Sequence, residues 1–366
     1  MDYFNDERIV MTLDAGGTKL SFNAVQAGKE LLKPVEMPAA AGNLHDFLKK
    51  IIRGFHEVAG QTSGKPCAIS FAFPGPADYT NGIIGDLQNL PVFRGGVALG
   101  RMLENEFRMP VYINNDGDLF AYGEAMSGLL PEINRLLREN DNSRQYRNLL
   151  GITLGTGFGG GIVRNGELFT GDNSAAGEIN RLRNCIFPQT SIEDSVTIRA
   201  VRRVYAENAG ITQDESPEPR EIFEIARGTV QGNKVAALKA YQDLAVATAG
   251  ALADAVSLID GLVVIGGGLS GAASLFLEDI VKEMNRKYHT LSGEMIDRME
   301  VHAYNLESGL SSFLEDTALT IEVPFSDQKL KYDPVKKIGV GITRLGTSGA
   351  VSVGAYAYAL DQLNRK

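Results

Sequence analysis

Apolar residues along the chain gather in short runs rich in β-branched side chains, and these runs alternate with longer segments of helical spacing. Ile9–Leu13 and Ala68–Phe73 are mainly apolar runs typical of buried strands, whereas Leu44–Val58 repeats apolar residues three and four positions apart, as in an amphipathic helix. Further strands are predicted at 20–26, 111–113, 149–154, 162–163, 262–265, 301–304 and 319–323, and further helices at 97–107, 119–126, 193–208, 234–259, 272–288 and 348–363. This alternation predicts an α/β protein with a largely parallel sheet.

A strand, a glycine-rich turn and a second strand occur twice, about one domain length apart, at Asp14–Lys19 and at Gly155–Gly161. At about 150 residues per domain, 366 residues predict two domains. We expect a small N-terminal α/β domain over 1–118 and a larger one over 119–347, with a C-terminal helix at about 348–366 that is able to pack back on the first. The charged segments 131–148 and 324–334 are interpreted as solvated insertions in the larger domain.

The two glycine turns have the composition of phosphate-binding loops. Glycine exposes backbone N–H groups, and these groups together with the hydroxyls of Thr18 and Thr156 can hold phosphate oxygens. Asp14, at the end of its strand, is suited to hold a magnesium ion directly or through water. Gly155–Gly160 fits G-x-G-x-x-G, but a strand follows it instead of the helix that a dinucleotide site requires. Either turn alone can be purely structural; the pair favours two tips that grip one polyphosphate.

Two further segments carry candidate chemistry at strand ends. Gly266–Gly268 follows the strand 262–265 and is either a flat platform for an adenine ring or a plain strand-to-helix turn. Asn114–Asp118 follows the strand 111–113, at the carboxyl end where α/β proteins place their sites. An Asp there is ionised at pH 7 and can accept a proton from a hydroxyl. Asp116 and Asp118 are both candidates, and a surface turn is the alternative.

Composition narrows the class of protein. The chain carries 36 Lys and Arg against 45 Asp and Glu, a net charge of −9, which argues against nucleic-acid or anionic-membrane partners. Two cysteines exclude a disulfide framework and a cysteine-rich zinc site. The acidic start lacks the apolar core of a signal peptide, and the longest uncharged run, Gly261–Leu277, is short for a membrane span. We expect a cytoplasmic protein.

Short motifs follow one another from about residue 8 to residue 364: Asp14–Lys19, Pro74–Asp78, Asn89–Pro91, Asn115-Asp116 with Gly123-Glu124, Leu154–Gly161, Ala176–Ile179, Ile265–Gly268, and Leu345-Gly346 with Gly349-Ala350. In this order they resemble the first phosphate motif, two sugar loops, catalytic segment, second phosphate motif, further sugar loop, adenosine motif and closing segment of the ROK family of sugar kinases, within the actin-like ATPase superfamily. The resemblance implies the two-domain actin-like (ribonuclease-H-like) fold with a cleft between the domains.

The resemblance also implies an activity, which is transfer of the γ-phosphoryl group of ATP, with magnesium, to a hexose hydroxyl, glucose to glucose 6-phosphate above all. By resemblance, Asp116 is the general base and the sugar partners are Gly75, Asn89, Asn115, Glu178 and Glu193. The residues that the resemblance assigns to binding of the nucleotide and its magnesium are Asp14, Gly16, Gly17, Thr18, Lys19, Gly155, Thr156, Gly157, Gly266, Gly267 and Gly268. Members of the family also lead us to expect a homo-oligomer, a dimer or a tetramer.

Three alternatives remain open. The first is an N-acetylhexosamine or fructose kinase of the same family. The second is a sugar-responsive regulator, which requires a DNA-binding segment ahead of the first phosphate motif; only 13 residues precede Asp14. The third is a sugar-binding protein without catalysis, which the presence of Asp116 and of both glycine loops disfavours.

The chain departs from the family pattern after the further sugar loop. Where family members commonly read Gly-Glu-Ile-Gly-His and then carry a zinc-binding cysteine cluster, this chain reads Gly177-Glu-Ile-Asn-Arg181, with Cys185 as the one nearby cysteine. One cysteine cannot make a four-ligand site, so we expect no structural zinc. Since sugar choice depends on which hydroxyls find partners, Arg181 in place of His leaves the preferred hexose open.

Overall fold

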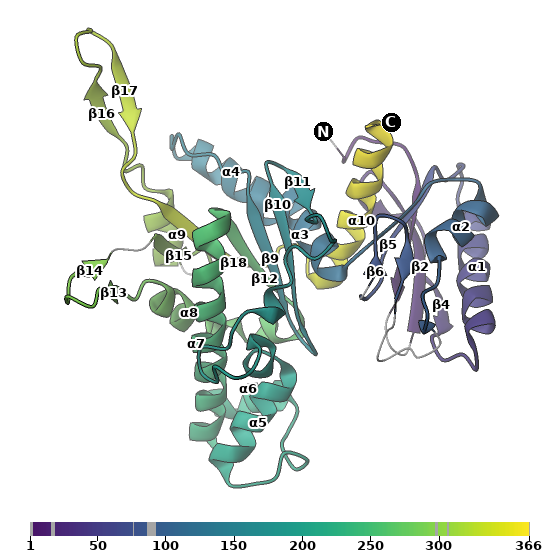
Figure 1. Ribbon diagram of the computed structural model, residues 1–366, viewed down its shortest axis with the longest axis horizontal. Coiled ribbons are helices and arrows are strands. Elements are labelled where there is room, and N and C mark those ends of the chain that lie inside the picture. The colour runs from purple at the N-terminus through teal and green to yellow at the C-terminus, as the bar shows by residue number, and fades with distance from the viewer. Residues whose placement is uncertain are drawn as a thin grey trace. The chain divides into compact units, whose positions relative to one another are not determined.

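The computed structural model describes residues 3–15, 19–75, 77–85, 93–296, 299–305 and 307–365. The chain forms two compact units (Figure 1). Unit one comprises Met1–Gly128, Gly161–Gly177 and Arg344–Lys366, and unit two comprises Leu129–Gly160 and Glu178–Thr343. The boundary expected after residue 118 therefore falls inside helix α3 (Asp116–Ser127), and the C-terminal helix α10 (Thr347–Asn364) belongs to unit one.

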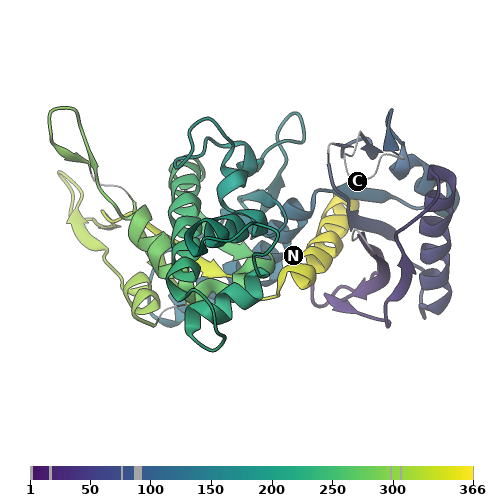
Figure 2. The ribbon, with the colours of Figure 1, turned by 90° about the horizontal axis from the view of Figure 1, so that it is seen from below.

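Unit one is built on a mixed sheet. Its strands lie in the order β3 (Lys29–Glu30), β2 (Lys19–Gln26), β1 (Val10–Ala15), β5 (Ala68–Ala72) and β8 (Val111–Asn114), and β4 (Val35–Pro38) also pairs with β2. β1 runs antiparallel to β2, whereas β1, β5 and β8 are parallel. Helices α1 (Leu44–Gln61) and α10 lie on opposite faces of this sheet (Figures 1 and 2). The unit also holds α2 (Leu99–Phe107) and the small pair β6 (Ala77–Asp78) and β7 (Ile83–Ile84).

Helix α1 shows how the sequence pattern produces one layer of this unit. The side chain of Asn43 accepts a hydrogen bond from the Asp46 N–H and caps the first turn. The apolar positions of α1, spaced three and four residues apart, are buried on the sheet together with Phe22 and Phe71: Phe47, Ile51, Phe55 and Val58. The predicted amphipathic helix is thus confirmed, and its apolar face forms the core of unit one.

Helices α3 and α10 approach so closely that only glycine fits at the contact. A Cβ on Gly123 would lie 1.9 Å from the Ala350 carbonyl oxygen, and a Cβ on Gly354 would lie 1.9 Å from the Leu119 carbonyl oxygen. Next to this crossing, the fully buried Glu124 accepts hydrogen bonds from the backbone N–H groups of Arg344 and Leu345, at 3.0 and 3.1 Å. Helix α3, which begins at Asp116, is therefore held from Leu119 to Glu124 by the C-terminal segment of the chain.

Unit two contains a parallel sheet whose neighbouring strands are β9 (Leu149–Leu154), β12 (Leu262–Gly266), β18 (Lys337–Ile342) and β15 (Glu300–Ala303). β10 (Phe158–Arg164) starts beside β9, crosses into unit one and forms an antiparallel hairpin with β11 (Glu167–Phe169). Asn165 and Gly166 at its turn have φ angles of 53° and 79°, as the Asn-Gly hairpin signal predicts.

The helices of unit two are α4 (Leu129–Glu139), α5 (Ile198–Ala209), α6 (Pro219–Arg227), α7 (Lys234–Ile259), α8 (Leu277–Met284) and α9 (Glu307–Leu314), with 3₁₀ turns at Ile179–Arg181, Ile192–Ser195 and Gly268–Leu275. Among the described residues, α7 alone has the length and hydropathy of a membrane span. Half of its most apolar window is buried, and it packs against α5, α6 and α8, which is typical of a core helix. Two hairpins complete the unit, β13 (Tyr288–His289) with β14 (Met295–Ile296) and β16 (Leu319–Glu322) with β17 (Lys329–Tyr332).

The two charged segments are not plain insertions, and that prediction was wrong in part. Segment 131–148 contains most of α4, whose charged residues cover one face while Ile133 and Leu137 are buried on the other. Segment 324–334 contains the strand β17. In segment 131–148 the many charged residues of one helix face obscured the helical repeat of the apolar residues. In segment 324–334 the alternation of apolar and polar residues was too short to predict a strand. Helix α6 and strand β18 were also not predicted.

Candidate functional site

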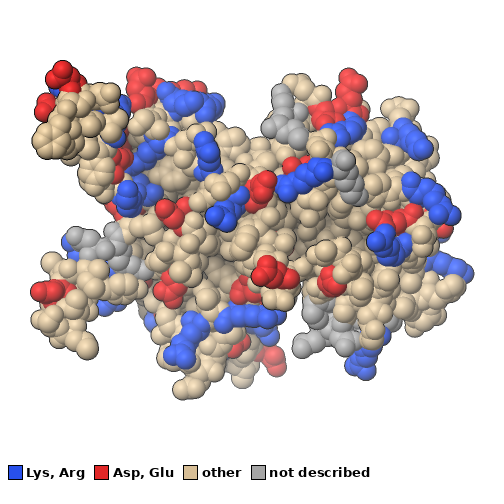
Figure 3. Space-filling model, turned by 45° about the horizontal axis from the view of Figure 1, so that its top comes forward, with Lys and Arg blue, Asp and Glu red and all other residues tan. Residues whose placement is uncertain are grey.

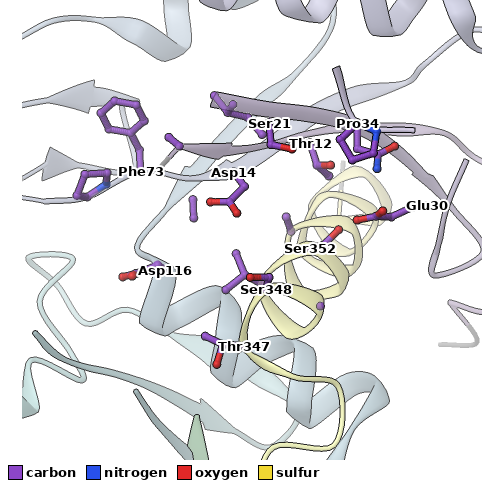
Figure 4. A pocket seen from close by; sticks show the side chains of 18 residues that line it. Thr12, Asp14, Ser21, Glu30, Pro34, Phe73, Asp116, Thr347, Ser348 and Ser352 are labelled. Atoms are coloured by element: carbon purple, nitrogen blue, oxygen red, sulfur yellow. The ribbon is translucent and has the colours of Figure 1, made fainter. Parts of the chain in front are cut away.

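A cavity of about 430 Å³ lies in unit one, between the ends of β1 and β2, the loop after β5, the start of α3 and the first turns of α10 (Figure 4). Its lining includes Asp14 from β1 and Asp116 from α3, which the sequence had placed 102 positions apart in two separate motifs. The fold therefore brings the predicted magnesium ligand and the predicted general base to one cavity.

Asp116 is the first residue of α3 and directly follows the Asn115 cap. The Asn115 side chain accepts a hydrogen bond from the Gly117 N–H at 2.8 Å, and the same N–H reaches Asp116 Oδ1 at 2.9 Å. Desolvation by the surrounding protein raises the pKa of Asp116, the Gly117 N–H opposes part of that rise, and the nearby Asp14 charge adds to it. A carboxylate with a raised pKa is a better proton acceptor than an ordinary Asp once it is ionised.

The structure decides between the two aspartates of this segment. Asp116 lines the cavity and is reached by solvent there, although surrounding protein desolvates its carboxyl group, whereas Asp118 is only 4% exposed and does not line the cavity. The two side chains point in different directions, since residues two positions apart on a helix face different sides. Of the two aspartates, Asp116 is therefore the one that faces the cavity.

Polar residues that sequence reasoning missed line the inner wall of the cavity. Thr12 pairs with Asn23 and Asp14 pairs with Ser21 across β1 and β2, so these four side chains share one face of the sheet. The Nδ2 atom of Asn23 is buried and has no hydrogen-bond partner within the described part of the chain. Hydroxyls from α10 add to the wall at Thr347, Ser348 and Ser352. Alternation of polar residues along β1 and β2 was the signal that could have found the strand residues.

The first phosphate loop can be described only in part. Gly16, Gly17 and Thr18 lie outside the described residues. Lys19 lies at the start of β2, and its Nζ forms an exposed ion pair with Glu36 at 2.5 Å. Lys19 is not in the lining of the cavity, and its role in phosphate binding stays a prediction.

The predicted sugar residues of unit one gather around Tyr79. The Tyr79 hydroxyl donates to the Phe73 carbonyl at 2.9 Å, and Asn115 Nδ2 lies 3.4 Å from the same hydroxyl. A Cβ on Gly75 would lie 3.2 Å from the Tyr79 hydroxyl, so Gly75 belongs to this group as well. The described part of the chain thus joins Gly75 and Asn115 next to Asp116, while Asn89 lies outside the described residues.

In unit two, the other two glycine motifs lie side by side. Gly155–Gly157 follows β9 and Gly266–Gly268 ends β12, and these parallel strands are paired through Thr153 and Gly266. A Cβ on Gly155 would lie 3.9 Å from the Gly268 nitrogen. Gly267 has a φ of +87°, and a Cβ there would lie 2.2 Å from the Leu154 carbonyl oxygen. A side chain at Gly267 would therefore push the two motifs apart.

Replacement of Gly267 by Ala is expected to raise the KM for ATP by about tenfold or more, because strain at a positive φ and the clash with Leu154 displace both glycine motifs. The matched control is Gly271→Ala, since a Cβ there meets nothing within 4 Å. Steady-state kinetics with varied ATP compares the two variants. Equal KM values for ATP in both would contradict a nucleotide role for these motifs.

The remaining predicted sugar residues lie in the loops after β11. Arg181 Nε lies 3.3 Å from Glu178 Oε2, so the residue that stands in place of the family His forms an ion pair with a predicted sugar ligand. Glu193 Oε2 accepts from the Phe158 N–H at 3.3 Å, and its other oxygen lies 3.8 Å from Arg199. This places Glu193 beside the second phosphate loop.

The side chains able to bind a metal ion can be compared with the predictions for magnesium and zinc. No group of three or more His, Cys, Asp or Glu side chains able to hold a metal gathers within the described ranges. Magnesium needs no such group, because it is commonly bound by one or two carboxylates together with substrate phosphates and water. Asp14, exposed at the cavity, fits that role. The expectation of no structural zinc stays a prediction.

Comparison with known proteins gives a consistent result. The family model described as "ROK family" matches residues 10–306. A crystal structure of a glucokinase from Parabacteroides distasonis is 50% identical, with a TM-score of 0.91 and 99% of each chain covered. A ROK hexokinase from Thermus thermophilus is 20% identical, with a TM-score of 0.67 over 97% of this chain and 99% of its own. These structures confirm the predicted α/β class and the actin-like ATPase fold.

Other relatives are named as kinases of two different sugars. The N-acetyl-D-glucosamine kinase of Vibrio cholerae is 31% identical over 172 residues, which are 46% of this chain and 51% of that protein. The chain thus spans about half the length of this relative. A glucokinase from Halalkalibacterium halodurans is 26% identical over 303 residues, which are 75% of this chain and 84% of that protein.

Proposed function

The chain belongs to the ROK family, and from this premise we propose that it transfers the γ-phosphoryl group of ATP to a hydroxyl of glucose. The observation that carries the proposal is Asp116, an accessible carboxylate of raised pKa at the start of α3, in a cavity that it shares with Asp14. The 50% identity to a glucokinase over 99% of the chain supports glucose as the acceptor.

In the proposed reaction, Asp116 removes the proton of the acceptor hydroxyl as that oxygen attacks the γ-phosphorus. The new O–P bond forms while the bond to the ADP oxygen breaks, and the proton stays on Asp116 until it is lost to solvent. Asn115 and Gly75, held around Tyr79, orient the sugar next to this carboxylate. Most of the rate enhancement comes from correct positioning of the sugar hydroxyl and ATP, because phosphoryl transfer requires little covalent chemistry from a protein.

The glycine motifs would bind the nucleotide. Gly155–Gly157 and Gly266–Gly268, which are adjacent in unit two, would hold the phosphates and the adenosine of ATP. Asp14 would hold magnesium, which supplies charge neutralisation on the phosphates when it is bound. A ROK glucokinase from Streptomyces griseus has been crystallised with glucose and AMPPNP, which supports ATP as the nucleotide here.

N-acetylglucosamine is the second candidate acceptor, because the 31% identical relative from Vibrio cholerae carries that activity in its name. Arg181 is the residue that we expect to affect the choice of sugar. A guanidinium in place of an imidazole presents more donors and no acceptor, and its ion pair with Glu178 removes part of that carboxylate from the sugar.

A coupled ADP-release assay across glucose, mannose, fructose, N-acetylglucosamine and N-acetylmannosamine tests the acceptor. We expect the largest kcat/KM with glucose, by about tenfold or more over the N-acetylhexosamines. A larger kcat/KM with N-acetylglucosamine than with glucose would contradict glucose as the acceptor and favour N-acetylglucosamine. Absence of hexose-dependent ADP release with every sugar would refute the kinase itself.

A further inference from the structure

A cavity of about 420 Å³ lies in unit two at the N-terminal end of helix α5. Its lining comes from the first two turns of α5, from the segment that leads into this helix, and from Gln213 beyond it. None of the residues that line it belongs to the predicted nucleotide, sugar or metal sites. Its volume is within the range of about 300–1,000 Å³ that is typical of small-molecule sites.

The start of α5 has hydrogen-bond donors that the protein does not use. Thr197 is the N-cap residue, a position at which threonine normally accepts from a backbone N–H of the first turn, but its side chain makes no such bond. Thr197 lines the cavity and is 1% exposed, and its Oγ1 atom has no hydrogen-bond partner within the described part of the chain. Arg199 and Ala200, the residues whose N–H groups such a cap would bind, line the same cavity. An acceptor bound in the cavity would therefore satisfy both the hydroxyl and the end of the helix.

Two arginines of α5, four positions apart and so on the same side of the helix, line this cavity. Arg203 is held in place, because it lies over the Phe187 ring at 5.3 Å and its Nη1 atom is 3.2 Å from Glu207. Arg199 lies 3.8 Å from Glu193, which is too long for a hydrogen bond, and its side chain is 65% exposed. The Arg199 guanidinium group is therefore able to turn toward a ligand.

The charges around the cavity favour an anion. Arg199 and Arg203 outweigh Asp194, the one carboxylate in the lining, and the positive end of the α5 dipole adds to them. The chain as a whole carries a net charge of −9, and Figure 3 shows Lys and Arg interspersed with Asp and Glu. The attraction for an anion is thus a local property of this cavity and does not come from a broad basic surface.

We propose that this cavity binds a phosphomonoester. The phosphate oxygens accept from the backbone N–H groups at the start of α5, from the Thr197 hydroxyl and from the guanidinium groups of Arg199 and Arg203. A helix N-terminus together with arginine side chains is an arrangement that binds phosphate groups in many proteins.

The rest of the cavity indicates what the phosphate is attached to. The Phe187 ring is 44% exposed and offers an apolar wall, and the Gln213 side chain offers an amide that donates and accepts hydrogen bonds. A carbon skeleton with hydroxyl groups fits both, so we assign the ligand to the class of sugar phosphates. This site does not depend on the kinase reaction proposed above, because none of its residues takes part in that reaction.

Isothermal titration calorimetry of the full chain with glucose 6-phosphate, without ATP, tests the proposal with two matched variants. Arg203→Gln and Arg227→Gln each remove an arginine that lies over a phenylalanine ring and pairs with a glutamate, but only Arg203 lines the cavity. We expect Kd to rise about tenfold or more for Arg203→Gln and less than about twofold for Arg227→Gln. Inorganic phosphate should compete more weakly than glucose 6-phosphate binds, and glucose alone should not compete.

Thr197→Val is a second variant, which keeps the shape of the side chain and removes the hydroxyl. It should weaken binding about tenfold, whereas the unfolding temperature without ligand should not fall, because the hydroxyl has no partner to lose. Wild-type protein that does not bind glucose 6-phosphate would overturn the proposal, as would a Kd that Arg203→Gln and Thr197→Val leave unchanged. Equal weakening by Arg203→Gln and Arg227→Gln would also overturn it, and inorganic phosphate that binds as tightly as glucose 6-phosphate would reject a sugar phosphate as the ligand.

Discussion

The Asp116→Asn variant is expected to lose turnover by about 10²- to 10⁴-fold, with the KM for the hexose changed by less than about threefold. Asparagine keeps the size and hydrogen-bonding shape of Asp116 but cannot accept the proton of the acceptor hydroxyl. Steady-state kinetics with varied hexose measures both constants. Asp46→Asn, in the first turn of α1 and outside the cavity, is the control and should keep wild-type values.

The pH profile of the wild-type chain adds a readout specific to the general base. Desolvation raises the pKa of Asp116 above its ordinary value, so kcat should fall as the pH decreases through that raised pKa, while Asp116 becomes protonated. The residual activity of Asp116→Asn should lack this acidic limb. An unchanged kcat in Asp116→Asn, or the same acidic limb in both proteins, would remove Asp116 from the role of base.

The same substitution should stabilise the fold near neutral pH. Because the pKa of Asp116 is higher in the folded state than in the unfolded chain, the folded state binds the proton more tightly, and stability is lost as the pH rises through the folded pKa. At pH 7 this penalty is present in the wild type and absent in Asp116→Asn. Urea unfolding at pH 7 and at pH 4 should show a gain from the substitution that shrinks at the lower pH.

Replacement of Gly354 by Ala is expected to destabilise the protein by about 3 kcal/mol or more, enough to prevent folding in a marginal domain. The added Cβ would lie 1.9 Å from the Leu119 carbonyl oxygen, and backbone cannot move aside as a flexible side chain does. Relief requires α3 and α10 to separate, and α3 carries Asp116. Any soluble Gly354→Ala protein should therefore also show a reduced kcat.

Gly349→Ala on the same helix is the matched control. Its Cβ would lie 3.9 Å from the Leu345 Cβ, an ordinary contact, so the free energy of unfolding should change by less than about 1 kcal/mol. Urea unfolding of the wild type and both variants makes the comparison. Similar stability for Gly354→Ala and Gly349→Ala would show that α3 and α10 do not pack as closely as described.

Sequence reasoning succeeded where a local pattern and a local structure coincide. The strand 111–113 followed by Asn115 and Asp116 predicted a polar residue at a strand end, and the structure places Asp116 at the cavity. The predicted helices α1 and α7 and the Asn165-Gly166 turn are present for the same reason. In each case the period or the turn residue alone determines the local conformation.

Contacts between residues far apart in the chain could not be predicted from the sequence. Ser21 and Asn23 join Asp14 only because β2 folds back on β1, and the hydroxyls of α10 come from the other end of the chain. The ion pair between the Lys19 ammonium group and Glu36 also joins residues 17 positions apart and had no signal in the sequence. Choosing between Asp116 and Asp118 required the register of α3, which no single-sequence pattern specifies.

The most direct test of the account is the stoichiometry of the reaction in one sample of wild-type protein with ATP, magnesium and glucose. ADP and glucose 6-phosphate are measured together, with a parallel sample that lacks glucose. The account predicts one glucose 6-phosphate for each ADP, and almost no ADP without the sugar. ADP formed at the same rate without glucose, or no ADP in either sample, would contradict it.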